Sequence, residues 1–283
     1  MLSTQRSENR HTEQSPQAVP GSGPGSGPGG RLSSPGVLSS PSIEALHETL
    51  GPQTGRDICD VGCGAGALAL SFAAQRPSRL VGVDPADGVL RAFRAAAAEH
   101  SAVVEAVQAS AEHLPFPDGE FDLVVSRLAA SRFADPRTAA AEMARLLRPG
   151  GRLAVIDLEG HAVPGVEALH QELERLRDPA FRRSHTLVEW IRLLHGAGLN
   201  VPMARSRLAE SRSGVSVARW CALTGSGTEA AASVRRRLSL ASEPQLHALG
   251  IRRRGSDYLL PVRTCLVVGV KRATDQAGPA LKP

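Results

Sequence analysis

The sequence predicts an α/β fold built on a mostly parallel sheet with helices on both faces. From Ile58 onward, short and continuously apolar segments alternate with helical ones, which is typical of parallel strands buried on both sides. A glycine-rich turn follows the first of these strands, at the edge of the sheet where parallel strands end and ligands bind. Together these observations predict a ligand-binding α/β domain.

The expected elements follow from the apolar runs and from the residues that end them. Ser42 is expected to cap a short helix over 43–50, which Gly51 and Pro52 end. Strands are expected over 58–61, 80–84, 103–107, 121–126 and 152–157, with helices over 65–74, 86–99 and 136–147 between them. Further helices are expected over 166–177, 187–197, 228–240 and 244–249, before a terminal strand over 258–270.

The chain divides into one domain and two tails. Residues 1–42 are rich in glycine, proline and serine and cannot bury enough apolar surface to fold, so we expect a disordered tail. We expect the folded domain over 43–272 and a flexible tail over 273–283. Because there is no signal-peptide core and no apolar run long enough to span a membrane, we expect a cytoplasmic location.

Charge and cysteine content restrict the function classes. The net charge is +5, and almost all basic residues are arginines. The densest clusters, 235–237 and 252–254, have no interleaved aromatic residues on which bases could stack, so we expect no nucleic-acid partner. Cys59 and Cys63 flank the glycine turn without a second cluster to complete a metal site, which predicts buried free thiols and no metal.

The glycine-rich turn is compatible with two cofactors. Glycines at this spacing bring backbone N–H groups close to a bound nucleotide-like molecule. Gly62, Gly64 and Ala67 satisfy the dinucleotide fingerprint, and Asp84 is the acid expected about 20 residues further on. Asp60, directly before the glycines, instead suits S-adenosylmethionine, because a carboxylate attracts its ammonium and sulfonium but repels a pyrophosphate. The acid therefore favours the second cofactor.

Further segments match a single family. They are the glycine turn over 57–67, the second strand and its end over 80–87, Ala-Glu-His-Leu-Pro-Phe-Pro-Asp-Gly-Glu-Phe-Asp over 111–122, Leu-Leu-Arg-Pro-Gly-Gly-Arg-Leu over 146–153, and the runs 174–179 and 184–190. From about 43 to 271 the chain thus resembles the class I S-adenosylmethionine-dependent methyltransferases of the ubiquinone/menaquinone-biosynthesis type (methyltransferase type 11). The resemblance implies a Rossmann-like, seven-stranded, mostly parallel sheet and a mostly helical, substrate-covering segment over about 160–257. It also implies S-adenosylmethionine as cofactor and O- or C-methylation of a small organic acceptor, a quinone-like molecule or a secondary metabolite.

The resemblance assigns a cofactor role to the turn itself. The backbone of Gly62, Cys63, Gly64 and Gly66 is expected to approach the methionyl and ribose parts. Asp60 is expected either to serve the ammonium end, directly or through water, or to cap the next turn.

The resemblance also assigns the ribose and adenine contacts. Asp84 is expected to accept hydrogen bonds from both ribose hydroxyls, with Pro85 shaping the wall beside the adenine. Ala111 is expected to contact the adenine through its backbone N–H, and Glu112 either lies beside it or is an ordinary loop acid. Ser110 stands where the family usually has an aspartate, so a neutral hydrogen bond of roughly 0.5–1.5 kcal/mol replaces a charged one.

Groups near the transferred methyl are expected to come from the ends of the fourth and fifth strands. Arg127 is expected near the methionyl group. Relatives often have a His-His pair where this chain has Ser-Arg-Phe, so Arg132 is expected either to orient an anionic oxygen of the acceptor or to be solvated. If the acceptor must lose a proton, His161 and then His185 are the expected bases, although each is as well explained by a surface or packing role.

Two alternative functions stay open at this point. In one, the same fold binds S-adenosylmethionine but catalyses a non-methylating reaction such as a cyclisation or rearrangement. In the other, the chain is an NAD(P)-dependent oxidoreductase. The short region before the first strand predicts either an open pocket or one closed by another subunit of a homodimer.

Overall fold

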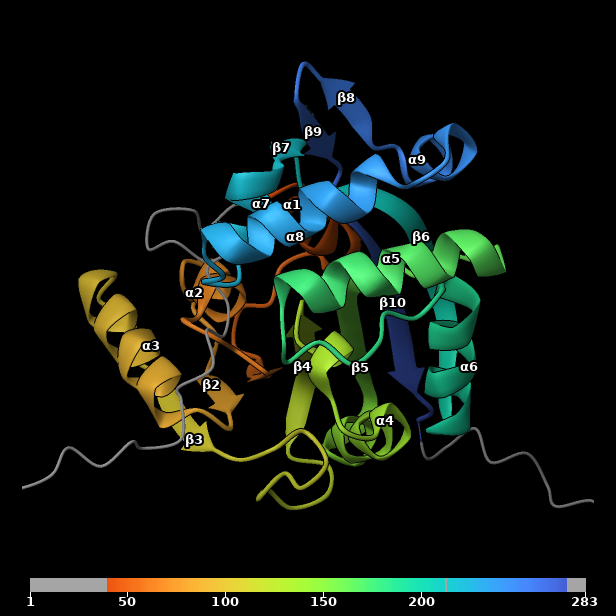
Figure 1. Ribbon diagram of the computed structural model, residues 1–283. Helices are drawn as coiled ribbons and strands as arrows, with labels where there is room; N and C mark the ends of the chain where they lie inside the picture. Colours follow the sequence, from red (N-terminus) through yellow and green to blue (C-terminus); the bar gives the residue numbers. More distant parts are fainter. Residues whose placement is uncertain (1–39, 212, 274–283) are drawn as a thin grey trace, which may run out of the picture.

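The computed structural model describes residues 40–211 and 213–273 (Figure 1). Its centre is a seven-stranded sheet in the order β3-β2-β1-β4-β5-β10-β6. The strands are β1 (Asp57–Val61), β2 (Arg79–Asp84), β3 (Glu105–Gln108), β4 (Phe121–Arg127), β5 (Leu147–Leu158), β6 (Leu199–Ala209) and β10 (Arg263–Lys271). β10 runs antiparallel to both of its neighbours, while β1 to β5 pair in parallel. The prediction of a Rossmann-like, mostly parallel sheet is confirmed.

Helices cover both faces of this sheet and close two apolar layers. Those on one face are α1 (Pro41–Leu50), α2 (Ala67–Ala73) and α3 (Asp87–Glu99), and those on the other are α4 (Pro136–Arg145) and α6 (Leu187–Gly196). Leu46, Phe72 and Phe93 are buried in the first layer. Met143 and Trp190 are buried in the second. Removal of these side chains from water is the main force that fastens the helices to the sheet.

A cap with an apolar core of its own lies over one end of the sheet (Figure 1). Its elements are α5 (Pro164–Arg177), α7 (Val217–Ala222), α8 (Thr228–Ser239), α9 (Glu243–Leu249), and a small sheet of β7 (Val215–Ser216), β9 (Asp257–Leu260) and β8 (Arg252–Arg254). Leu169, Trp220, Val234 and Leu260 meet in its interior. Leu158, the last residue of β5, packs there too, so the cap is joined to the carboxyl end of a parallel strand.

The two ends of the domain differ from the prediction. α1 begins at Pro41 with Ser40 as its N-cap, not Ser42, because the Ser40 hydroxyl accepts a hydrogen bond from the Ile43 N–H at 3.4 Å. The strand expected over 258–270 is two strands, β9 and β10, in different sheets. Pro261 lies between them and cannot donate to a ladder, which separates them.

β6 was not predicted at all. It is an edge strand beside β10, and of its side chains only Leu199 is fully buried. Such a strand carries a weak apolar pattern, so the sequence does not reveal it. As a consequence, the segment over 160–257 is not one helical cover. β6 is part of the main sheet, α6 packs on that sheet, and the cap elements make up the rest.

The predicted tails fall almost entirely outside the described residues. Within the described ranges, no helix is long and apolar enough to cross a membrane. In the same part of the chain, no three His, Cys, Asp or Glu side chains are grouped so as to bind a metal ion. All four cysteines are buried and free.

Candidate functional site

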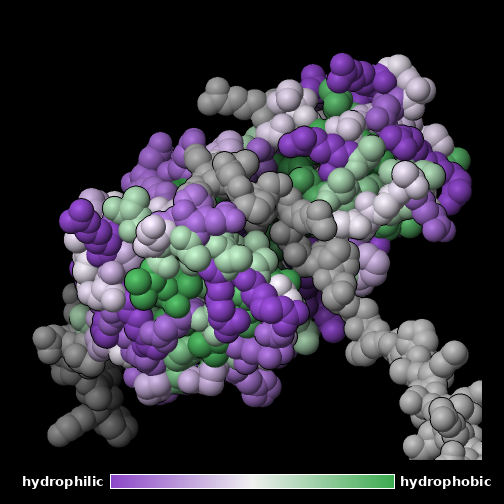
Figure 2. All heavy atoms as spheres, turned by 90° about the vertical axis from the view of Figure 1, so that its left-hand side faces the viewer, coloured by the Kyte–Doolittle hydropathy of each residue, from purple (hydrophilic) through white to green (hydrophobic). Residues whose placement is uncertain are grey.

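A cavity of about 390 Å³, called the first cavity below, opens where β1, β2 and β4 end beneath the cap. Its walls are the turn after β1, the end of β2, the loop 109–112, the residues after β4, and the cap residues around 177–181 and 223–224. Figure 2 shows apolar side chains in the recess between the body of the domain and the cap. Sites for small molecules typically measure about 300–1,000 Å³ and are mostly apolar, so the first cavity has the size and character of a ligand site.

Asp84, at the end of β2, presents a carboxylate to the first cavity. It accepts hydrogen bonds from the N–H groups of Gly64 at 3.2 Å and Ala86 at 3.0 Å. Burial raises its pKa, while these two N–H groups and the charge of Arg132 oppose the rise. A carboxylate offers about four acceptor sites, so two remain for a ligand with adjacent hydroxyl groups.

Gly64 and Gly66 have different parts in the turn after β1. Their φ angles are 55° and 90°, in the left-handed region that favours glycine. Gly64 lines the first cavity, and nothing lies within 4 Å of the position that a Cβ would take, so its backbone is open to a ligand. Gly66 does not line the cavity, and a Cβ there would overlap the ring of Phe93. The structure therefore assigns Gly66 to packing against α3 rather than to the ligand.

Asp60 lies behind the turn and is only 1% exposed. Its Oδ2 accepts a hydrogen bond from the Ala69 N–H at 3.0 Å, which ties α2 to β1. Its Oδ1 is buried without a partner. Burial raises the pKa of Asp60 to about 7, against the opposing effects of the Ala69 N–H and of Arg127. Asp60 thus caps the helix with one oxygen and keeps the other for a donor.

Arg127 lines the first cavity, but its guanidinium is bound to other parts of the protein. Nε donates to the hydroxyl of Ser42 at 3.2 Å, and Nη2 donates to the hydroxyl of Ser40 at 3.2 Å. Nη2 also pairs with the buried carboxylate of Glu210 at 3.1 Å. The side chain therefore joins the start of α1 to the segment after β6, beneath the cavity.

The loop after β3 forms another wall of the first cavity, with Ser110, Ala111 and Glu112 facing Pro85. Glu112 accepts a hydrogen bond from the Ala134 N–H at 2.8 Å. The carboxylate thus joins this loop to the segment before α4.

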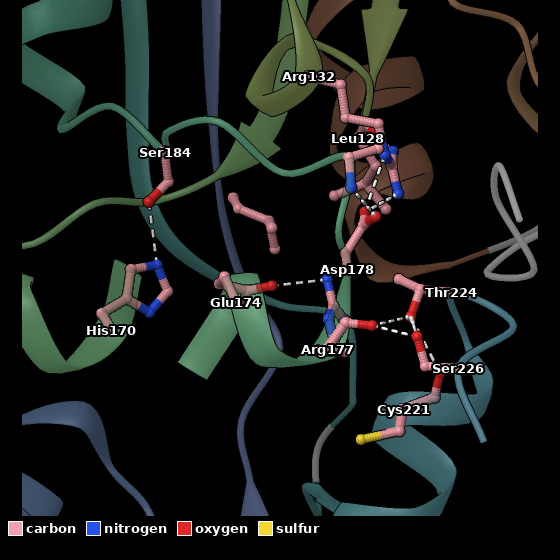
Figure 3. Close-up of polar contacts among 12 residues, drawn as sticks. Leu128, Arg132, His170, Glu174, Arg177, Asp178, Ser184, Cys221, Thr224 and Ser226 are labelled. Atoms are coloured by element: carbon pink, nitrogen blue, oxygen red, sulfur yellow. Dashed lines mark hydrogen bonds and ion pairs between the residues drawn. The ribbon is translucent and has the colours of Figure 1, made fainter. Parts of the chain in front are cut away.

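On the cap side, Arg132 makes an ion pair that the sequence did not reveal (Figure 3). Its Nε donates to Asp178 at 2.8 Å, and its Nη1 donates to the Leu128 carbonyl at 3.0 Å. Asp178 directly follows α5 and its side chain is only 4% exposed. The guanidinium, expected either to orient the acceptor or to be solvated, instead fastens α5 to the end of β4. The signal for Asp178 was its position in the family-like run 174–179, whose role only the fold revealed.

Neither predicted base lies at the first cavity. His161 lines a second cavity, on the other side of Leu158, where its Nε2 lies 3.2 Å from the Ala248 carbonyl. His185 is buried against the Trp190 ring, and burial lowers its pKa. β5 ends at Leu158, and the chain then turns toward α9, which carries His161 past the first cavity, while His185 lies before α6. The predicted residues that meet there are Gly62, Cys63, Gly64, Asp84, Pro85, Ser110, Ala111, Glu112, Arg127 and Arg132.

Comparison with known proteins identifies this arrangement, since residues 59–155 match the family described as a methyltransferase domain. Residues 59–155, about a third of the chain, therefore resemble a methyltransferase domain. An uncharacterized methyltransferase, YcgJ of Bacillus subtilis (strain 168), is 37% identical over 134 residues, which are 47% of this chain and 53% of that protein. Nocamycin O-methyltransferase of Saccharothrix syringae is 40% identical over 119 residues, 41% of this chain and 42% of that protein. The chain thus spans about half the length of these curated relatives.

The solved structures agree with the methyltransferase domain. The crystal structure of the Bacillus YcgJ protein superposes with a TM-score of 0.73 at 27% identity, covering 82% of this chain and 98% of that one. S-adenosylmethionine is the cofactor of this domain, and the polar groups at the first cavity fit it. Asp84 has two acceptor sites left for the ribose hydroxyls, whereas Asp60, which does not line the first cavity, keeps one unpartnered oxygen behind the glycine turn.

Proposed function

We propose that the protein transfers the methyl group of S-adenosylmethionine to a small organic acceptor in the first cavity. The observation that carries this proposal is the turn after β1, where Gly64 offers open backbone and Asp84 offers free acceptor sites at the mouth of a cavity closed by the cap. The match of residues 59–155 to methyltransferase domains supports the reaction. The relative named nocamycin O-methyltransferase supports O-methylation of a small organic acceptor such as a secondary metabolite.

The chain's contribution is to bind, orient and exclude water. The cofactor supplies an electrophilic methyl group on a sulfonium. Asp84 would hold the ribose hydroxyls and the open backbone at Gly64 would lie against the cofactor, which would fix the position of that methyl group. Phe133, Phe181 and Leu223 give the opposite wall its apolar character, so the acceptor meets the methyl group away from bulk water. In-line positioning of two reactants accounts for a large part of the rate enhancement in such transfers.

Among the described residues, each carboxylate at the first cavity has another partner or role. Asp84 accepts two backbone N–H groups and would hold the ribose, Glu112 accepts the Ala134 N–H, and Asp178 is paired with Arg132. A strong general base is therefore not offered to the acceptor. We propose O- or C-methylation of an acceptor that ionises readily or that reacts at an electron-rich carbon.

Calorimetric titration of the full chain with S-adenosylhomocysteine and with NADH tests the cofactor. We expect S-adenosylhomocysteine to bind and NADH not to bind, and tight binding of NADH alone would overturn the proposal in favour of an oxidoreductase. Asp84→Asn should weaken S-adenosylhomocysteine binding. The exposed neighbour Asp87 offers a matched control, because Asp87→Asn makes the same charge change outside the cavity.

Formation of S-adenosylhomocysteine from S-adenosylmethionine tests the reaction itself. A panel of phenolic and quinol-like acceptors should yield a methylated product and S-adenosylhomocysteine in equal amounts. An altered product without S-adenosylhomocysteine would instead support the non-methylating alternative. A cytoplasmic location, a homodimer and the absence of a nucleic-acid partner stay predictions.

A further inference from the structure

A second cavity, of about 410 Å³, lies between the cap and the ends of β5, β6 and β10. It is as large as the first cavity, and neither the glycine turn, the end of β2 nor the loop 109–112 lines it. Much of its wall is apolar and comes from α5, α7, α9, β9 and the residues that follow them: Leu173, Trp220, Leu249, Ile251, Leu260 and Val262. These side chains also belong to the cap core, so the hollow is a built part of the cap.

Two arginines, Arg207 of β6 and Arg263 of β10, lie on this wall, 56 positions apart in the sequence. Arg207 is exposed to solvent at the cavity, and its guanidinium has neither a hydrogen bond nor an ion pair among the described residues. Within the same residues, the Arg263 guanidinium makes one long hydrogen bond, from Nη1 to the Ala248 carbonyl at 3.4 Å. Burial and the charge of Arg207 lower the pKa of Arg263. Two positive charges are therefore brought together without a full partner.

The acidic groups at this cavity do not neutralise the two arginines. Glu159 lines the cavity, and its oxygens accept hydrogen bonds from the Ser206 hydroxyl and the Arg207 backbone N–H, both at 2.6 Å. It raises the pKa of Arg263, but burial and Arg207 outweigh it. Glu174 also lines the cavity and pairs with Arg177 at 2.7 Å. The cavity thus keeps an excess of positive charge beside an apolar wall.

A thin wall separates the two cavities. Leu158 lines both of them. Beside it, Glu174 faces the second cavity and Arg177 faces the first, and the two side chains form a buried ion pair (Figure 3). The Arg177 guanidinium also lies 4.5 Å from the ring of Trp220, which is part of the second cavity. Leu158 and this ion pair are therefore what separates the second cavity from the first.

We propose that the second cavity binds an amphipathic carboxylate, with its apolar body against Trp220 and its neighbours and its carboxylate between Arg207 and Arg263. Guanidinium groups bind carboxylates through charge-assisted hydrogen bonds. An apolar wall favours a ligand with a hydrocarbon body, because that body is removed from water there. This proposal does not rest on the proposed function, because the carboxylate would bind on the other side of Leu158 from the first cavity.

Titration calorimetry on the full chain saturated with S-adenosylhomocysteine tests the proposal, with octanoate, octan-1-ol and octylamine as probes of equal chain length. We expect octanoate to bind at least about tenfold more tightly than either of the others. Equal affinities for octanoate and octan-1-ol, or tighter binding of octylamine, would overturn it.

The double variant Arg207→Gln/Arg263→Gln tests the anion contact. It should lose about tenfold or more in octanoate affinity and keep its affinity for octan-1-ol. The control Arg192→Gln/Arg254→Gln makes the same charge change at exposed arginines outside both cavities, and it should bind all three probes as the unchanged protein does. An equal loss in both double variants would show a general charge effect and refute the site.

S-adenosylhomocysteine affinity, measured in the same variants, separates the two proposals. It should be unchanged in all of them, which also shows that they are folded. Octanoate binding without S-adenosylhomocysteine binding would support the carboxylate site and contradict the proposed function. The reverse result would support the proposed function and contradict the carboxylate site.

Discussion

Asp157 provides a quantitative test of how burial affects this fold. It lies near the end of β5, is 1% exposed, and accepts a hydrogen bond from the Leu158 N–H at 2.7 Å. Burial raises its pKa from the ordinary value of 3.8 to about 7, although this N–H and the charge of Arg132 oppose the rise. We predict that Asp157→Asn stabilises the protein at neutral pH and not at pH 4.

The direction in which stability changes with pH depends on whether the folded or the unfolded protein holds the proton. Between pH 3.8 and about pH 7, folded Asp157 keeps a proton that the unfolded chain has already released. The stability that this group contributes is therefore complete below the lower pKa, falls as the pH rises through the window, and stays lost above pH 7. Each pH unit in this window lowers the free energy of unfolding by about 1.4 kcal/mol, so the total loss between pH 3.8 and about pH 7 is about 4 kcal/mol.

Urea unfolding at pH 4, 5.5, 7 and 8.5 measures this effect. Because asparagine does not titrate and has the shape of a protonated carboxyl, the variant should match the unchanged protein near pH 4. At pH 7 and above, the free energy of unfolding of the variant should exceed that of the unchanged protein by about 4 kcal/mol. Asp87→Asn, at an exposed position, controls for the change in net charge. A stability difference that is constant from pH 4 to pH 7 would refute the reasoning.

Three further variants test separate parts of the structure. Asp84→Asn should weaken S-adenosylhomocysteine binding by roughly tenfold to a hundredfold, since hydrogen bonds to a charged group are worth about 1.5–3 kcal/mol; unchanged affinity in calorimetry would contradict the ribose assignment. Gly66→Ala should destabilise the fold by about 1–3 kcal/mol in urea unfolding, because its Cβ overlaps Phe93, and a neutral result would mean that α3 shifts freely. Arg177→Met should cost about 3–5 kcal/mol by leaving Glu174 buried without a counter-charge; the added change Glu174→Gln should recover most of this, and no recovery would argue against the pair.

The order of the parallel elements was predictable because the information is local. Buried strands such as β1 and β4 are continuous apolar runs, and the turns that end them carry glycine or an acid at fixed positions. Asp60, Gly64 and Asp84 were identified for the same reason, since the turn and the end of the neighbouring strand are each defined by a short segment. Parallel pairing then brings those segments to one edge of the sheet.

The cap side of the site could not be predicted in the same way. Arg132 looked free to bind an acceptor, and only the packing of α5 on the end of β4 gives it Asp178 as a partner. His161 follows a parallel strand, where catalytic groups are common, yet the turn after β5 carries it to the far side of Leu158. Partners that are distant in sequence leave no local pattern, so such residues are assigned only once the chain is folded.

The sequence by itself determined the α/β class, the glycine turn and the acids that fit S-adenosylmethionine, because hydrophobic periodicity and turn chemistry act over a few residues. The tertiary structure decided what surrounds that cofactor site. It places β6 at the sheet edge, commits Arg132 and Arg127 to ion pairs, and brings Arg207 and Arg263 together at a second cavity. These features depend on contacts between segments tens of residues apart, and burial there sets the charges and the free donors that a ligand would meet.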